Sequence, residues 1–226
     1  MLAFWSALLA ISVWGEGMRA VPIAVSAPRD VSDSLVNQIG AEASTIWKSA
    51  GITFVWHRVG SEAEAGDWPL DITIDDSRDS VEPHALGWIT FTANRPDRSI
   101  HLSLARADDL LRTTPGLNDK TIASHEVLIG RALGRALAHE LGHYLLQSKA
   151  HTSSGLMRRI WSADDSFAFS RIGFELTAEQ RAAAFGYLAR NERDPPTDRS
   201  NPADQNRSTR TRSGEGRPAE SRKDWR

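Results

Sequence analysis

The sequence contains no cysteine. This absence excludes a disulfide scaffold, a thiolate zinc finger, an iron–sulfur cluster and a cysteine nucleophile. A metal ion bound by this chain must therefore be held by histidine, aspartate or glutamate side chains. Because chains without cysteine occur in oxidising and in reducing compartments, the absence does not indicate where the protein acts.

An excess of charge of one sign is also missing. The chain has 27 Lys and Arg against 29 Asp and Glu, which gives a net charge of −2. No basic field is present to attract nucleic acid, so we expect no nucleic-acid partner. The length of 226 residues, with 40% hydrophobic and 25% charged residues, is typical of one soluble globular domain with extensions. Neither number indicates an oligomeric state.

A hydrophobic run long enough to span a bilayer is missing as well. Residues 2–14 are apolar apart from Ser6 and Ser12, and small residues follow up to Ala20. That length suits the core of a signal peptide and is too short for a membrane span, although no Lys or Arg precedes Arg19. We expect residues 1–20 to be a cleaved export signal, which would make the protein secreted or extracytoplasmic; a retained anchor and a misassigned start are the alternatives.

At the C-terminal end, residues 191–226 contain almost no apolar side chains. Such a segment cannot bury enough surface to offset its ordering entropy, so we expect a disordered polar tail. An electrostatic tether to an envelope surface is the alternative role. Residues 21–190 remain as the folded domain.

This middle part begins with the pattern of a parallel strand–helix–strand unit. Residues 21–26 are an apolar run that predicts a strand, and Ser32 or Asp33 can cap a helix that extends to about residue 50. Residues 52–59 are rich in β-branched and aromatic side chains and predict the next strand. Short joints between these elements favour a right-handed parallel arrangement.

The remaining elements complete an α/β (α+β) domain. Further strands are predicted over residues 70–74, 86–92 and 100–104, with a turn over residues 93–99 and a short helix over residues 106–111. A long helix is predicted from residue 124 to 146 or 147, followed by an irregular segment up to residue 155. Thr177 and Gln180 form a capping box that opens a last helix, which extends to about residue 190.

The long helix contains the segment His139-Glu140-Leu141-Gly142-His143. Four residues advance a helix by about one turn, so both imidazoles point the same way and suit two ligands of one tetrahedral zinc ion. Glu140 lies about 100° round the helix, beside that face, where it can act as general base on a water without being a ligand. Exposed polar positions on an ordinary helix are the alternative, but the flanking residues 132–146 are mostly apolar, and buried His and Glu need a partner.

A hydrolytic zinc ion of this type needs a third protein ligand and an open position. His151, in the irregular segment after the helix, and Glu175, before the last helix, are the main candidates. His151 could instead be a surface histidine, and Glu175 could be an acidic residue near a helix start.

This stretch resembles the metzincin superfamily of zinc peptidases. His139, Glu140 and His143 match the start of the family pattern, and Met157 in Ser154-Gly155-Leu156-Met157 resembles its methionine turn. The family glycine position holds Leu146 and the usual third-ligand position holds Lys149, so the resemblance implies a variant in which His151, after seven intervening residues, is the third ligand.

The resemblance, to the small matrixin-type domain in particular, covers most of residues 21–190. It implies a mixed, twisted five-stranded sheet with a backing helix, an active-site helix and a C-terminal helix. It also implies that the strand with Gly87 and Trp88 is an edge strand that pairs with an extended substrate; a core strand with Trp88 packed inside is the alternative.

The expected function is therefore that of a zinc-dependent endopeptidase with one Zn²⁺ ion, Glu140 as catalytic base, and a protein or peptide as substrate. A zinc-binding protein of the same fold without general proteolysis, or with one dedicated partner, is the first alternative. The second is an interaction module of the cell envelope that uses the tail.

Overall fold

The computed structural model describes residues 19–59, 70–80, 82–117 and 121–193. The expected export signal lies outside these residues except for Arg19 and Ala20, and the expected disordered tail lies outside them from residue 194 onwards. Within the described ranges, no helix has the length and apolar content that a membrane span requires.

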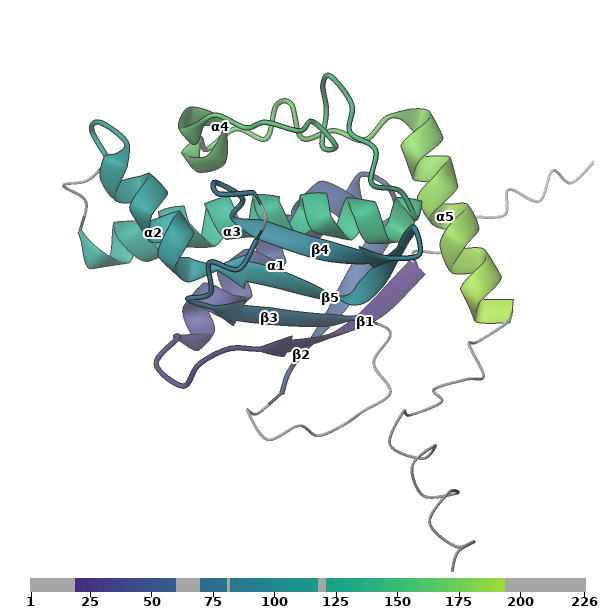
Figure 1. The fold of residues 1–226 in the computed structure, drawn as a ribbon, viewed down its shortest axis with the longest axis horizontal. Helices are drawn as coiled ribbons and strands as arrows, with labels where there is room; N and C mark the ends of the chain where they lie inside the picture. Colours follow the sequence, from purple (N-terminus) through teal and green to yellow (C-terminus); the bar gives the residue numbers. More distant parts are fainter. Residues whose placement is uncertain (1–18, 60–69, 81, 118–120, 194–226) are drawn as a thin grey trace, which may run out of the picture. The chain divides into compact units, whose positions relative to one another are not determined.

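Five strands form one mixed sheet (Figure 1). Their order across the sheet is β2-β1-β3-β5-β4. The first three neighbouring pairs are parallel, and β4 runs antiparallel to β5 at the edge. The strands are β1 (Arg19–Ser26), β2 (Ile52–Arg58), β3 (Asp71–Asp75), β4 (Gly87–Thr92) and β5 (Arg95–Ser103).

Helices α1 and α3 lie on the same side of this sheet, behind it in Figure 1. The helices are α1 (Asp33–Lys48), α2 (Leu104–Thr113), α3 (Ile122–Leu146), α4 (Ala163–Phe167) and α5 (Ala178–Arg193). Ser32 caps α1 by accepting a hydrogen bond from the Leu35 N–H, at 3.0 Å. The fully buried Trp47 joins α1 to α3, since its indole N–H donates to the Ala138 carbonyl oxygen at 3.0 Å.

The predicted parallel β1–α1–β2 unit and the mixed five-stranded sheet are confirmed. The capping box at the start of α5 is present as well, because the Thr177 N–H donates to Gln180 Oε1 and the Gln180 N–H donates to Thr177 Oγ1. α4 was not predicted, since it is a single short turn that a second capping box, between Ser162 and Asp165, holds in place.

The expected turn over residues 93–99 is wrong. Only Ala93 and Asn94 turn the chain, both with positive φ (48° and 66°), and β5 begins at Arg95. Pro96 had indicated a loop, but β3 pairs with β5 only from Ser99 onwards, so the missing N–H of Pro96 breaks no ladder on that side. The last residue of the predicted strand, Leu104, instead begins α2 behind the cap Ser103.

Replacing Ala93 by glycine should stabilise the protein by about 0.5–1 kcal/mol, because glycine adopts a positive φ without the cost that a Cβ atom adds. Chemical denaturation of the wild type and the variant measures this difference. Ala41→Gly, at an exposed position within α1, is the control and should destabilise by about 1 kcal/mol. A loss of stability in Ala93→Gly would show that this turn carries no such strain.

Candidate metal centre

α3 presents three of the predicted site residues on its partly buried face. Its apolar side packs into the core, where Leu137 and Leu141 are almost fully buried. His139, Glu140 and His143 are buried as well, with exposed fractions of 8%, 8% and 5%. Polar groups this deeply buried cost free energy unless they are satisfied, so their partners decide what the site can do.

The two helix histidines point their Nε2 atoms at each other, 3.1 Å apart. Their other ring nitrogens are occupied: His139 Nδ1 donates to the Leu156 carbonyl oxygen at 2.8 Å, and His143 Nδ1 donates to the Ser148 carbonyl oxygen at 2.7 Å. A donating Nδ1–H leaves the lone pair on Nε2. Both imidazoles are therefore held in the tautomer that can bind a metal ion through Nε2.

His151 completes a group of three. One ligand atom from each of His139, His143 and His151 lies within 4.8 Å of the others, and the structure brings together no other such group of His, Asp and Glu among its described residues. The His151 ring stacks on that of His139 and meets that of His143 edge-on, with centroid distances of 5.3 and 4.9 Å. The chain turns back because Gln147 ends α3 in the left-handed conformation, with φ at 51°.

The alternative third ligand, Glu175, does not reach the histidines. Its carboxylate accepts a hydrogen bond from the Gly173 N–H at 2.9 Å, and its carbonyl oxygen accepts one from the Leu156 N–H at 2.9 Å. Glu175 therefore supports the loop behind the site through its backbone and is not one of the grouped side chains. Lys149 lines the cleft beside the histidines and is exposed.

Met157 lies directly under the site helix and is 1% exposed. A Cβ atom at Gly142 would overlap the Met157 sulfur, so only glycine allows this contact between the turn and α3. The Met157 carbonyl oxygen accepts from the Thr152 N–H at 2.9 Å, next to His151. The methionine thus joins the helix to the loop that carries His151.

Burial determines the protonation of these groups. It lowers the pKa of His139 to about 4 and lowers the pKa values of His143 and His151, so all three imidazoles are neutral near pH 7, the form that binds metal ions. Burial also raises the pKa of Glu140 to about 8, against a hydrogen bond from the Ile89 backbone. A cation bound by the histidines would favour the ionised carboxylate and lower this pKa again.

β4, which begins with Gly87 and Trp88, lies at the edge of the sheet. A Cβ atom at Gly87 would lie 2.8 Å from a Leu102 methyl and 3.4 Å from Glu140 Cγ, so glycine lets the strand pass close over the base. Trp88 is half-buried and stacks on His101 at 5.2 Å instead of entering the core. Phe91, farther along β4, meets the His143 ring edge-on.

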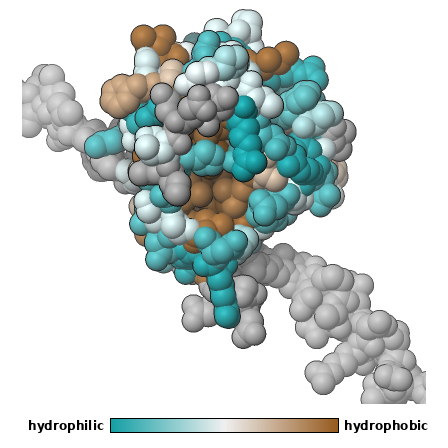
Figure 2. Space-filling model, turned by 90° about the vertical axis from the view of Figure 1, so that its left-hand side faces the viewer, coloured by the Kyte–Doolittle hydropathy of each residue, from teal (hydrophilic) through white to brown (hydrophobic). Residues whose placement is uncertain are grey.

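One cleft, with a volume of about 620 Å³, is lined by β4, by α3 and by part of the segment that follows Met157. The three histidines, Glu140, Gly87, Trp88 and Phe91 all belong to this lining. Its apolar part includes Leu86, Ile89, Leu110 and Ala136. On the face drawn in Figure 2, a hollow has hydrophobic residues at its floor and mostly hydrophilic residues around it. Sequence reasoning missed Arg135 in this lining; its only signal was a charged residue within an apolar helix.

The buried carboxyl predicts a pH dependence of the metal-free fold. Between its ordinary value of 4.5 and its folded value of about 8, Glu140 keeps a proton in the folded state that the unfolded state has lost, so stability falls as the pH rises. His139 acts in the opposite direction, because its pKa is lower in the folded state than in the unfolded state. Its effect on stability changes only between about pH 4 and 6.5 and is constant above that range. Chelator-treated protein should therefore lose about 2 kcal/mol between pH 6.5 and 8.

Urea denaturation across this range measures the loss, and Glu140→Gln should abolish most of it. The control is Glu179→Gln, which removes a carboxyl whose pKa is lowered, mainly by a backbone hydrogen bond, and which should leave the slope unchanged. Equal slopes for the wild type and Glu140→Gln would show that Glu140 is not buried as described.

No protein-family model matches the sequence, and no curated protein matches it. Among solved structures, archaemetzincin from Methanopyrus kandleri is similar over 78% of this chain and 99% of its own, at 14% identity and a TM-score of 0.47. Metalloproteinase-II from Bacteroides fragilis is similar over 75% of this chain and 53% of its own, at 13% identity and a TM-score of 0.43. Myroilysin is similar over 73% of this chain and 71% of its own, at 13% identity and a TM-score of 0.32. Similarity at this level does not establish an activity.

The chain's own features agree with the resemblance seen in its sequence. β4 is antiparallel at the edge of a mixed sheet, α3 carries the first two histidines, and His151 joins them from the loop above Met157. The protein thus combines a mixed five-stranded sheet with a histidine triad, in the pattern HExxH followed by seven residues and a third histidine, that could hold a metal ion.

Proposed function

We propose that the protein is a zinc-dependent endopeptidase whose metal ion is held by His139, His143 and His151. One observation carries this proposal: two imidazoles fixed by backbone carbonyls converge through Nε2, a third joins them, and a buried glutamate lies beside them in the same cleft. A site that only stores metal has no need of that glutamate.

The three side chains fit zinc. Two nitrogen ligands with bonds of 2.0–2.1 Å in tetrahedral geometry lie about 3.3 Å apart, close to the 3.1 Å between the Nε2 atoms of His139 and His143. All three ligands are neutral imidazoles in a chain without cysteine. Three protein ligands with an open fourth position are the composition of catalytic zinc sites, whereas structural sites use four.

A zinc ion held there would supply a Lewis acid that acidifies a water molecule and polarises a carbonyl. Glu140 is the group that moves the proton. Its carboxylate accepts a proton from the water as that water attacks the scissile carbonyl carbon, and it then donates the proton to the departing amine nitrogen. The C–O bond forms and the C–N bond breaks, and the carboxylate is regenerated.

The shape of the cleft supports an extended peptide as substrate. Its lining along α3 extends from Ala132 to His143, which is about 16 Å of helix and matches about five residues of extended chain. β4 borders the same cleft at the edge of the sheet, where a peptide strand can pair with its backbone. The lining extends from the histidines towards Ala132, so a peptide has room to continue on that side of the cleaved bond.

Glu140→Gln tests the reaction directly. The amide keeps the shape of the side chain and cannot accept the proton, so the variant should bind one zinc ion per chain and lose at least about 10²-fold in rate. Elemental analysis and cleavage of a peptide library, with and without chelator, measure the two properties. Unchanged turnover would remove Glu140 from the mechanism, and wild-type protein without stoichiometric metal would contradict the proposal as a whole.

His151→Ala tests the third ligand. We expect it to lose most of the zinc affinity and peptidase activity, because two histidines then remain where three are needed. Glu175→Ala and Lys149→Ala are matched controls from neighbouring loops and should keep the metal. Loss of zinc in Glu175→Ala together with retention in His151→Ala would place the third ligand before α5 instead.

A further inference from the structure

The two walls of the cleft are irregular segments that carry few backbone hydrogen bonds of their own. Residues 78–80 and 82–86 lie on the β4 side, and residues 158–174, interrupted only by the short α4, lie on the other side. Carbonyl groups in such segments need donors from elsewhere when water is excluded. In both walls a buried arginine supplies them.

Arg106, at the start of α2, binds the wall on the β4 side. It is 8% exposed, and its guanidinium donates to four carbonyl oxygens. Nη1 reaches Glu82 and Ala85 at 2.5 and 3.0 Å, and Nη2 reaches Arg78 and Ser80 at 2.6 and 3.4 Å. The same guanidinium lies 5.9 Å from the Trp88 ring centroid.

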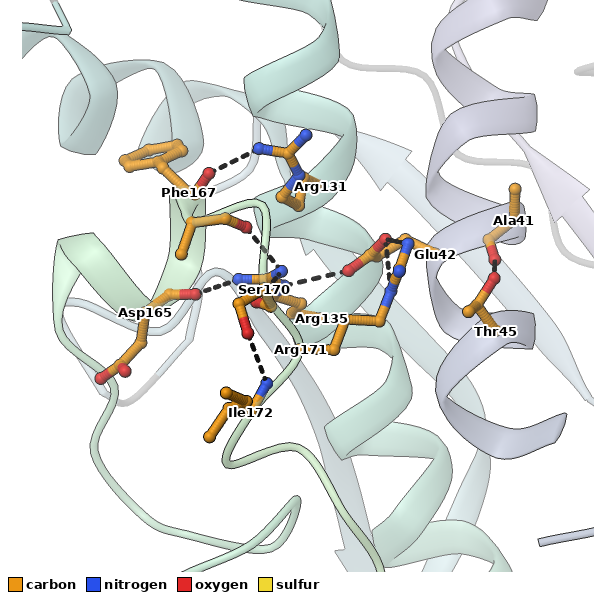
Figure 3. A network of polar contacts seen from close by, with 11 residues as sticks. Ala41, Glu42, Thr45, Arg131, Arg135, Asp165, Phe167, Ser170, Arg171 and Ile172 are labelled. Atoms are coloured by element: carbon orange, nitrogen blue, oxygen red, sulfur yellow. Dashed lines mark hydrogen bonds and ion pairs between the residues drawn. The ribbon is translucent and has the colours of Figure 1, made fainter. Parts of the chain in front are cut away.

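Arg135, on α3 one turn before His139, binds the opposite wall and is 3% exposed (Figure 3). It donates to the carbonyl oxygens of Asp165, Ala168 and Ser170, the last two at 2.7 and 2.8 Å. Its charge is balanced by Glu42 on α1, since Nε lies 3.0 Å from Glu42 Oε1. Figure 3 shows Glu42 between Arg135 and Arg171, and Arg171 donates to Glu42 Oε2 at 2.5 Å.

Arg135 also contacts the aromatic surface of its wall. Its guanidinium lies 4.6 Å from the Phe174 ring centroid, and Phe174 stacks on Trp161 at 3.9 Å and 8°. Both rings line the cleft. A shift of Arg135 would therefore move the apolar surface that a substrate side chain meets.

An ion pair joins the two walls of the cleft. Arg159 Nη2 lies 3.1 Å from Glu82 Oε1, and both side chains are 67% exposed. An exposed pair of this kind contributes little to stability. The positions of the walls therefore depend on the buried arginines beneath them.

We infer that Arg106 and Arg135 are positioning residues that fix the two walls of the cleft at the separation that an extended peptide requires. The inference rests on the proposed peptidase function for the identity of the ligand. Each guanidinium reaches three or four carbonyls from separate nitrogens in a rigid planar fork, whereas lysine carries its three donors on a single nitrogen and cannot reproduce that spread. Because the walls are set before binding, the arginines reduce the ordering cost of binding and leave the chemical step unchanged.

The test uses the zinc-loaded full chain and its Arg106→Lys, Arg135→Lys and Arg58→Lys variants. Arg58 is the matched control: it donates to the Val31 carbonyl oxygen at 3.0 Å and pairs with Asp33, away from the cleft. Hydrogen–deuterium exchange of each wall, zinc affinity, KM and kcat are measured for a peptide that the wild type cleaves. Arg106→Met and Arg135→Met provide a second, stronger pair of variants.

Arg135→Lys should raise amide exchange within residues 162–174 only, and Arg106→Lys within residues 78–80 and 82–86 only. Both should raise KM about tenfold and leave kcat and zinc affinity within about twofold, whereas Arg58→Lys changes none of these. A merely structural role would lower kcat, metal affinity and global stability together. Unchanged exchange in the walls of the Lys and Met variants, or a KM equal to that of the wild type, would overturn the inference. If the wild type cleaves no peptide, the proposed function fails, and exchange alone then decides whether the arginines fix the walls.

Discussion

Hydrogen bonds from the Nδ1 atoms of His139 and His143 to backbone carbonyls hold the site together. The acceptors, on Leu156 and Ser148, come from the chain that follows α3, so the helix alone cannot orient its own histidines. The return of that chain depends on the left-handed Gln147 and on the contact between Met157 and Gly142. Once Gln147 and Met157 are in place, the Nε2 lone pairs of His139 and His143 point to one position, and His151 joins them from the same loop.

The same constraint explains the polar groups inside a helix that is otherwise buried. A buried imidazole, carboxyl or guanidinium costs several kcal/mol unless it is paired. His139 and His143 are satisfied by carbonyls, Arg135 by Glu42 and three further carbonyls, and Glu140 by the Ile89 backbone. α3 thus carries two of the site histidines and also holds one wall of the cleft through Arg135, so both depend on the same rigid element.

The HExxH segment and the parallel start of the sheet could be predicted from sequence because local patterns determine them, whereas the edge position of β4 was implied only by the family resemblance. Helical spacing places His139 and His143 on one face, and short joints favour the β1–α1–β2 crossover. The length of β5 could not be predicted, since the absence of a β3 partner beside Pro96 is a tertiary fact. Arg106 and Arg135 were missed for the same reason, because their partners are carbonyls up to 35 residues away with no sequence signature. The sequence offered both His151 and Glu175 as the third ligand. Only the folded loop shows that His151, and not Glu175, lies beside His139 and His143.

X-ray absorption at the zinc edge of the full chain, loaded with one equivalent of zinc, tests the histidine triad most directly. We predict three imidazole nitrogens and one further light ligand at about 2.0–2.1 Å, with one imidazole lost in His151→Ala and none in Glu175→Ala. A first shell with fewer than three imidazoles, or one that loses a carboxylate in Glu175→Ala, would contradict a three-histidine zinc centre.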